Sequence, residues 1–369
     1  MNRRRILIGS GAVAALGGGA AYLGLRQMGS MEDYIAAVAA SRRELTQQPE
    51  MGELIRYATL AANGHNTQPW RFRVGARAIE ILPDFTRRTP AVDPDDHHLF
   101  ASLGCAAENL SLAAAASGRL GDVRFDPANA GSVVFTFDGA TNAPASAISE
   151  LFKAIPRRQS TRAEYDGRLV SAANLRTLAA AAAAIPGVDL ILITDRAQMG
   201  RVRDLVLTGN TSQMADTAFV RELKTWLRFS PRQALASSDG LFSAASGNPT
   251  LPSWLGPRLF DIVFKADAEN KKYAKQIQSC AGIAVFVSAR DDKAHWMRAG
   301  QACQRFALQA TALGLKHAFI NQPVEVASLR PELAALVGLP GRRPDIVMRF
   351  GYGAALPFSA RRPVDAVLA

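Results

Sequence analysis

The sequence predicts an α+β fold made of two pseudo-repeats, each with a small mixed sheet flanked by helices, packed like a dimer within one chain. The 369 residues are 48% hydrophobic, which suffices to bury the cores of two domains of ordinary size. Two small-residue helices, around Gly104 and Gly300, repeat each other. A β-branched run, residues 343–353, ends at glycines and predicts a late strand.

The first 28 residues form a targeting segment and are excluded from the fold. Arg3 and Arg4 precede an uncharged stretch rich in Gly and Ala, residues 6–25, in the pattern of a twin-arginine export signal. We therefore expect a periplasmic or otherwise exported protein. About 20 apolar residues can also span a bilayer, so an uncleaved anchor is the alternative. Membrane contact is expected only through this segment.

A turn rich in amide side chains follows the first predicted helix of the folded part. Helix-favouring residues 51–62 lead into an Asn-Gly pair that tolerates positive φ and ends a helix. Asn66 and Gln68 then lie beside exposed backbone N–H groups, before the apolar run 70–74. Amides so placed suit a polyhydroxylated ligand. The alternative is a helix cap followed by an edge strand.

Three polar side chains alternate in the segment 156–165. In an extended chain Arg158, Ser160 and Arg162 share one face, so two guanidinium groups and a hydroxyl point the same way. Arginine forks match phosphate, and the hydroxyl adds a further hydrogen bond. The alternative is a solvated basic linker.

These segments, together with residues 343–364, resemble the flavin-contacting parts of the nitroreductase family, closest to its Acg-like branch. The resemblance covers roughly residue 32 to the C-terminus. It implies a nitroreductase-type fold, FMN as cofactor and no catalytic side chain, because the flavin carries the chemistry. It assigns to the cofactor Arg158, Ser160, Arg162, Gly64, His65, Asn66, Gln68, Asn321, Gln322 and Arg361.

The resemblance also implies a role for each group. Arg158 and Ser160 would hold the FMN phosphate and ribityl chain, and Arg162 would face the flavin pyrimidine. Arg361 matches the family's terminal arginine, whereas Ser359 stands where a lysine is often found, which predicts a weaker phosphate site.

The segment 314–323 resembles the connection from helix to strand whose backbone N–H approaches flavin N5, at Asn321 or Gln322. A plain helix, glycine cap and strand is the alternative there. His65 would touch the flavin edge or the substrate, or else hydrogen-bond to its own loop.

The motifs occur in reverse order for this family, and an internal duplication explains the reversal. Aligning Gly104 with Gly300 gives an offset of 300 − 104 = 196 and superposes further small residues of both helices. We expect a first repeat at 29–150 and a second at 151–369. The stretch 179–188 is an alanine run where the amide turn would recur. A single FMN in a monomeric chain is therefore expected.

The resemblance implies reduction of nitroaromatics, quinones or similar small acceptors, with electrons from NAD(P)H or an unknown donor. An insertion at about 211–250 forms a candidate lid, within which residues 222–247 include Trp226 and Phe229 as aromatic side chains able to stack on a ring. An FMN-binding or FMN-storing protein with little turnover is the alternative function.

The remaining features favour no other class. The formal charge is +11, and removing the four arginines of the first 28 residues leaves 11 − 4 = +7, without a nucleic-acid-binding motif. Cys105, Cys280 and Cys303 are expected as buried free thiols. Residues 95–98 (Asp-Asp-His-His) fit a solvated helix N-terminus better than a metal site, so no metal is expected.

Overall fold

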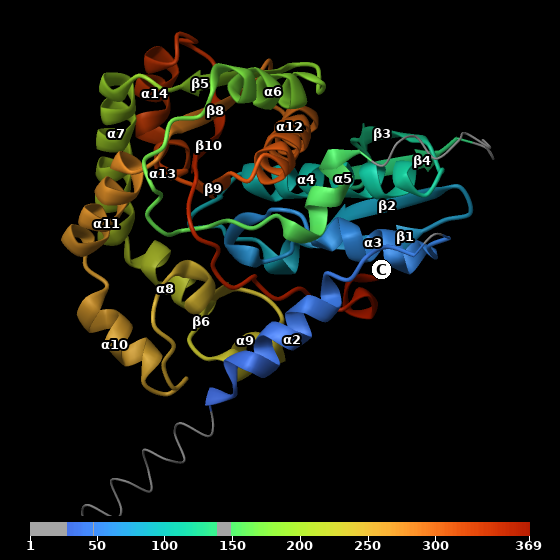
Figure 1. Cartoon of the computed structure of the whole chain (residues 1–369), viewed down its shortest axis with the longest axis horizontal. Coiled ribbons are helices and arrows are strands. Elements are labelled where there is room, and N and C mark those ends of the chain that lie inside the picture. The colour runs from blue at the N-terminus through green and yellow to red at the C-terminus, as the bar shows by residue number, and fades with distance from the viewer. Residues whose placement is uncertain (1–27, 47, 139–148) are drawn as a thin grey trace, which may run out of the picture.

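Two four-stranded sheets, each covered by helices, organise the chain (Figure 1). The computed structural model describes residues 28–46, 48–138 and 149–369, so the predicted signal or anchor lies outside the described residues except for its last position.

The first sheet has the strand order β1-β2-β4-β3. Ile79, Ile81 and Phe135 of this sheet share one core with Leu103 and Ala107 of α4, the helix that covers it. By length and composition α4 is the one helix among the described residues that could cross a membrane, but most of it is buried in this core. The elements of this part are α2 (Met31–Ser41), α3 (Met51–Thr59), β1 (Trp70–Val74), β2 (Ala78–Pro83), α4 (His97–Ala116), β3 (Gly121–Asp126) and β4 (Ser132–Phe137).

The second sheet has the order β5-β8-β10-β9 and is covered on both faces. Its central strands β8 and β10 are buried at every residue, as apolar strands are when helices cover both faces. One core contains α6 and α12, and the other contains α7 and α14. The elements are α5 (Glu150–Ala154), α6 (Ala172–Ala183), β5 (Val188–Ile193), β8 (Gly282–Ser288), α12 (Lys293–Ala312), β9 (Lys316–Phe319), α13 (Gln322–Glu325), α14 (Arg330–Leu336) and β10 (Pro344–Gly351).

The two halves are equivalent, which confirms the predicted duplication. In each sheet the four strands, numbered as they follow in the chain, lie in the spatial order first, second, fourth, third. The helices α4 and α12 are each 20 residues long and begin 196 positions apart. The two helices cross where neither has a side chain. A Cβ added at Gly104 would lie 1.9 Å from the Met297 carbonyl oxygen, and one at Gly300 would lie 1.9 Å from that of Ala101. Such reciprocal contact is the mark of a twofold interface, here within one chain.

Parallel pairing occurs at the outer edge of each sheet. All ladders between the strands of these two sheets are antiparallel. Beyond them, Leu368 forms a parallel bridge with Phe72 of β1, and Ser160 forms one with His317 of β9. The sheets are therefore mixed only at these edges. There a segment outside the four strands, at Leu368 in one sheet and at Ser160 in the other, pairs with the edge strand.

A long helical excursion separates β5 from β8. The equivalent strands of the first sheet, β1 and β2, are joined by residues 75–77 alone. The excursion contains the candidate lid at 211–250, and Figure 1 shows α8, α9 and α10 together at one end of the molecule. Its elements are α7 (Arg196–Ala215), α8 (Thr217–Thr225), β6 (Leu227–Arg228), α9 (Pro231–Ser237), β7 (Leu241–Phe242), α10 (Gly256–Val263) and α11 (Ala266–Gln278).

Candidate functional site

The amide turn after α3 has a strained backbone. His65, Asn66 and Gln68 have φ values of 47°, 53° and 52°, in the left-handed region that residues other than glycine seldom adopt. The Asn63 side chain braces the turn, because its Oδ1 accepts a 2.9 Å hydrogen bond from the backbone N–H of Gln68. Such strain persists only where the surroundings fix it, and it is frequent at ligand sites.

The two amides of the turn have different surroundings. Asn66 borders a polar recess, where its Oδ1 accepts a 2.8 Å hydrogen bond from Nη1 of Arg361. Gln68 is fully buried and lines neither recess nor cavity. Its Nε2 donates to the Ser238 carbonyl at 2.8 Å, and its Oε1 accepts from the Arg362 backbone N–H at 2.8 Å. Gln68 therefore joins the excursion to the C-terminal tail rather than facing a ligand.

Three arginines converge on this recess, whose volume is about 40 Å³. Arg158, from the predicted alternating segment, meets Arg361 of the tail and Arg42 at the end of α2. Burial, together with the charges of the other arginines, lowers the pKa of Arg42 well below its usual value and that of Arg361 to about 9. Burial alone accounts for the lowering of the Arg158 pKa to about 10.

No carboxylate of the described residues pairs with these three guanidinium groups. Backbone carbonyls satisfy part of each: Arg361 Nε donates to Thr59 at 2.7 Å, and Arg42 Nη1 donates to Pro156 at 2.8 Å. The Nε atoms of Arg42 and Arg158 are buried and have no hydrogen-bond partner among the described residues. Buried charges are normally paired, so this recess fits an anion, and its arginine forks suit a phosphate.

Sequence reasoning missed Arg42. Its position depends on the packing of α2 against the tail: Tyr34 Oη donates to the Phe358 carbonyl at 2.8 Å, and the Arg42 guanidinium lies 4.0 Å from the Phe358 ring centre. Ser359 also lines the recess. Arg42 therefore supplies a cation to the site in which Ser359 replaces the family's lysine.

A larger cavity of about 560 Å³ adjoins the recess. Ala62, Asn63, Arg162 and Leu241 line both spaces, so the two are continuous. Of the predicted cofactor residues, the recess is lined by Arg158, Ser160, Arg162, Asn66 and Arg361, and the cavity by Arg162, Gly64, His65, Asn321 and Gln322. The structure thus brings every predicted residue except Gln68 to one connected space.

Arg162 stands at the junction of recess and cavity. Its backbone carbonyl accepts a 2.6 Å hydrogen bond from Nε2 of Gln276, while its guanidinium forms none with the described residues. Burial lowers the pKa of Arg162. Tyr165, three residues on, is buried: its Oη donates to the Thr161 carbonyl at 3.0 Å, and its ring centre lies 4.2 Å from the Arg349 guanidinium.

Several polar atoms face the cavity without a partner. Nδ1 of His65 and Oε1 of Gln322 are buried and form no hydrogen bond with the described residues. Burial, and then the charge of Arg162, lowers the pKa of His65 to about 4, so the imidazole is neutral at pH 7. Asn321 is held by its Oδ1, which accepts from the Val347 backbone N–H at 2.8 Å. Such groups mark a site that a polar ligand completes.

The excursion forms an apolar roof over the cavity. Phe229 is only 8% exposed and lines it, as the lid hypothesis requires. Trp226 does not line it, and lies 5.3 Å from the Arg87 guanidinium instead. The expectation that Trp226 faces a bound ring is therefore wrong. The other apolar side chains of the roof are Met214, Phe219, Leu223, Leu227, Leu251, Leu259, Phe260, Val263 and Phe264.

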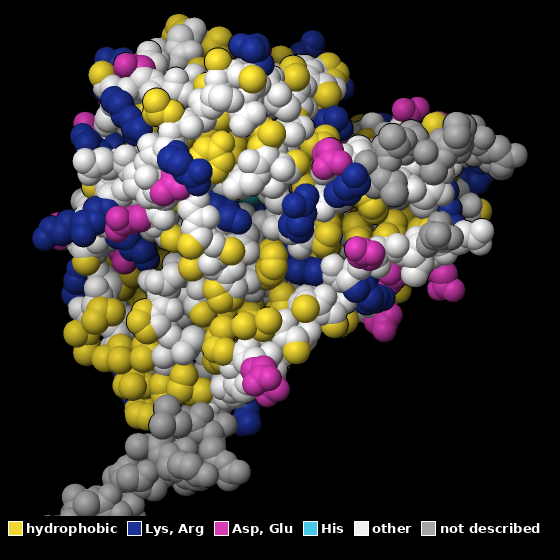
Figure 2. Space-filling view, in the orientation of Figure 1, with side chains coloured by type: hydrophobic (Ala, Val, Ile, Leu, Met, Phe, Trp, Pro, Cys, Tyr) yellow, Lys and Arg dark blue, Asp and Glu magenta, His cyan; other side chains and the backbone are white. Residues whose placement is uncertain are grey.

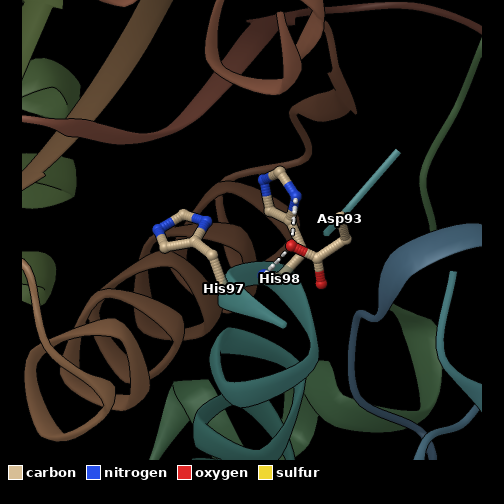
Figure 3. Close-up of side chains that lie close together, drawn as sticks. All are labelled: Asp93, His97 and His98. Carbon is tan, nitrogen blue, oxygen red and sulfur yellow. Dashed lines mark hydrogen bonds and ion pairs between the residues drawn. The ribbon is translucent and has the colours of Figure 1, made fainter. Parts of the chain in front are cut away.

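Asp93, His97 and His98 lie close together at the start of α4, with ligand atoms within 4.8 Å of one another (Figure 3). Asp93 accepts hydrogen bonds from the backbone N–H groups of His98 and Leu99, so it caps the helix. His97 is fully buried and lies 2.8 Å from Asp345 through Nε2. The expectation of a helix N-terminus is confirmed, and it is solvated only in part: Asp95 is exposed, whereas His97 is buried against Asp345 of the second repeat.

The three cysteines are free and buried, as expected. Cys105 and Cys303, on the crossing helices, line the cavity floor, and Cys105 Sγ donates to the Gly300 carbonyl at 3.1 Å.

Comparisons with known proteins identify the family of this chain. The model of the nitroreductase family matches residues 155–353. Two Mycobacterium tuberculosis proteins named as NAD(P)H nitroreductases are similar over most of their length. Rv3131 is 28% identical over 326 residues, covering 85% of this chain and 90% of its own, and acg is 24% identical over 331 residues, covering 85% and 93%.

Among solved structures, a nitroreductase with bound FMN from Desulfitobacterium hafniense is 18% identical, covers 58% of this chain and 95% of its own, and has a TM-score of 0.38. The family match itself extends over more than half of the sequence. The chain is thus a member of the nitroreductase family.

Proposed function

We propose that this protein is an FMN-dependent oxidoreductase that takes electrons from NAD(P)H and passes them to a small acceptor such as a nitroaromatic or a quinone. The observation that supports it most is the recess itself. Arg42, Arg158 and Arg361 place three positive charges, two buried and the third half-buried, at one end of a cavity, and no described carboxylate neutralises them. A phosphate-bearing cofactor with an extended ring matches this pairing of anion recess and cavity.

FMN would supply the two-electron redox chemistry. The chain's own residues would bind and orient it: the three arginines and Ser160 at the phosphate, and the strained turn with Arg162 along the ring. On the cavity side, Oε1 of Gln322 would accept a hydrogen bond, and Nδ1 of His65 would accept or donate one according to its tautomer. The apolar roof would exclude water from the site.

An anaerobic titration tests this proposal. Purified yellow protein mixed with NADPH should lose its absorbance near the flavin maximum, and a nitroaromatic or quinone should restore it. Protein that contains no flavin after purification, and that does not bind added FMN, would contradict the cofactor assignment.

A second candidate function is FMN binding or storage with little turnover. It is favoured by the roof, because Phe229 and Phe260 are nearly buried and line the cavity, where a nicotinamide would need open space beside the flavin ring. Bleaching by dithionite but not by NADPH in the same titration would support storage or another electron donor.

We further propose that the protein is exported and that it acts as a monomer. The twin-arginine pattern of residues 2–8 and the uncharged stretch 6–25 favour export, with membrane attachment where the segment is retained. A single chain carries both halves of the pseudo-dimer, which favours a functional monomer. Fractionation of the cells that produce the full chain would test the location.

A further inference from the structure

Helix α10 has apolar side chains on two different sides. Its inner side meets the roof: Phe260 is 9% exposed and stacks on Phe264 with ring centres 4.1 Å apart. A second stripe consists of Leu255, Leu259, Ile262 and Val263, which stand at helical positions i, i+4, i+7 and i+8 and so share a flank. Ile262 is 66% exposed and Val263 is 64% exposed. This flank, with Trp254 before it, is called the α10 flank below.

The α10 flank is part of an exposed apolar surface. Trp254 is 56% exposed, so three large apolar residues within ten positions face outward. Figure 2 shows hydrophobic side chains gathered over the end of the molecule where Figure 1 places α10. Contiguous surfaces of this kind on soluble domains mark interaction sites.

This surface lies at the end of the molecule where the described chain begins. Gly29 packs against Arg232 of α9, and α2 contacts α9. Figure 1 shows the start of α2 at the same end of the molecule as α10. The uncharged stretch 6–25 ends at Leu25, three residues before Met28. Three residues of extended chain reach at most about 10 Å, so a bilayer that holds this stretch is necessarily close to this end.

We infer that the α10 flank docks on a lipid bilayer and that the cavity opens toward the lipid at this helix. Trp254 has the residue type that prefers the membrane interface. Arg258 of α10 and Lys265, the residue before α11, are exposed and pair with no carboxylate of the described residues. Each donates only to a backbone carbonyl, at Trp254 and Asp261, so both charges remain available to anionic headgroups. An amphipathic helix with these features lies in the plane of the interface.

The cavity gives this docking a functional consequence. Leu259 and Val263 belong to the α10 flank and also line the cavity. An apolar acceptor dissolved in the bilayer would reach the site along this helix without crossing water. If the protein is the proposed oxidoreductase, its acceptors are molecules that partition into lipid.

Site-specific fluorescence in the full chain tests the docking. The native cysteines are buried, so an Ile262→Cys variant would carry an environment-sensitive dye at one position. Vesicles of phosphatidylcholine and phosphatidylglycerol should shift its emission to the blue and raise it. The matched control is Leu169→Cys, whose emission should not change. Leu169 is an exposed leucine just before α6, the helix that Figure 1 shows at the end of the molecule opposite α10.

An Ile262 dye that stays unshifted while the protein floats with the vesicles would overturn the inference, because the N-terminal segment alone would then hold the chain. A blue shift without vesicles that grows with protein concentration would assign the flank to a second copy, and would also overturn it. Neither readout depends on flavin, so an intact shift in a chain that fails to bind FMN would contradict the proposed function but not the docking.

A paired variant connects docking with the cavity. Trp254→Ser with Ile262→Asp changes two residues that do not line the cavity. It should keep the reduction of a water-soluble acceptor while losing most of the reduction of a lipid-dissolved one in vesicles. Equal loss of both rates, or of neither, would contradict lipid access through α10.

Discussion

At the scale of single residues, the three recess arginines are held by the fold in spite of their charge. Arg42, Arg158 and Arg361 repel one another and are neutralised by no described acid. Their repulsion therefore lowers the free energy of unfolding of the apoprotein, and a bound anion would raise it again. This is the pattern expected of a binding site rather than of a structural ion-pair network.

Replacing Arg158 by Ala should lower the affinity for FMN roughly tenfold to a hundredfold, since a charge-assisted contact to a desolvated phosphate contributes about 1.5 to 3 kcal/mol. Fluorescence titration of the apoprotein with FMN measures this affinity. The control is Arg201→Ala, at an exposed arginine of α7, which should leave the affinity unchanged. The same variant should lose the rise in melting temperature that inorganic phosphate gives the wild-type apoprotein. Unchanged affinity and an unchanged phosphate effect would place the phosphate elsewhere.

His65 predicts a pH dependence of the apoprotein. Its pKa falls from 6.5 in the unfolded chain to about 4 in the fold, so between these values the unfolded state binds more protons. The free energy of unfolding should therefore fall as the pH drops from 6.5 to 4, by at most about 3 kcal/mol for this group. Asn tolerates the left-handed backbone, so His65→Asn should flatten this part of the curve. Parallel curves for the two proteins, from denaturant unfolding, would assign the effect to other groups.

At the scale of elements, the crossing of α4 and α12 depends on two glycines. A methyl group at Gly104 would meet the Met297 carbonyl, so the helices must separate to admit it. Gly104→Ala should lower the free energy of unfolding by about 1 to 3 kcal/mol or more. Gly200→Ala in α7, where an added Cβ meets nothing within 4 Å, should instead raise it by up to about 1 kcal/mol. Thermal melts of both variants check the pair, and equal effects would refute the close crossing.

The roof is fixed to the first repeat through Asp239. This side chain pairs with Arg87 near the turn and with Arg228 of β6, the latter at 2.6 Å. Although burial opposes it, hydrogen bonds from the two arginines lower the pKa of Asp239. Asp239→Asn leaves both guanidinium groups without their partner, at a cost of about 3 to 5 kcal/mol.

If the roof limits access, Asp239→Asn should increase proteolysis within the excursion and speed the reduction of bound FMN by NADPH. Asp204→Asn, an exposed residue on α7, is the control. Loss of FMN without faster reduction, in stopped-flow traces, would mean that the excursion only joins the repeats.

The sequence predicts those features that depend on neighbouring residues, and it does not predict those set by packing between distant segments. The strand at 70–74, the helix around Gly104 and its copy around Gly300 follow from composition and periodicity, and the structure has them. The sequence does not show that Arg42 lines the recess, or that Gln68 lies outside both the recess and the cavity. The environment of each is set by the packing of α2, the tail and α9, which are distant in the chain. Trp226 was misplaced because the direction of a side chain in an irregular insertion has no periodic signal.

At the scale of the whole molecule, the duplication predicts the number of cofactors. The amide turn and the arginine recess border one connected space, and the connection after α6 that is equivalent to the turn lacks amides. Flavin released by denaturation, counted against protein, should give one FMN per chain. A ratio near two would show that the second half retains a site of its own.

The edge of the first sheet has a consequence for synthesis. Phe72 pairs with Leu368, and its carbonyl accepts a 2.9 Å hydrogen bond from the N–H of Ala369, the last residue of the sequence. Arg71 binds the Leu368 carbonyl 297 positions away. The residues that complete the first sheet are therefore made almost 300 positions after the strand they pair with. The first half cannot reach its final strand pairing before the second half has been synthesised, so a fragment limited to the first repeat should leave the edge of β1 uncovered.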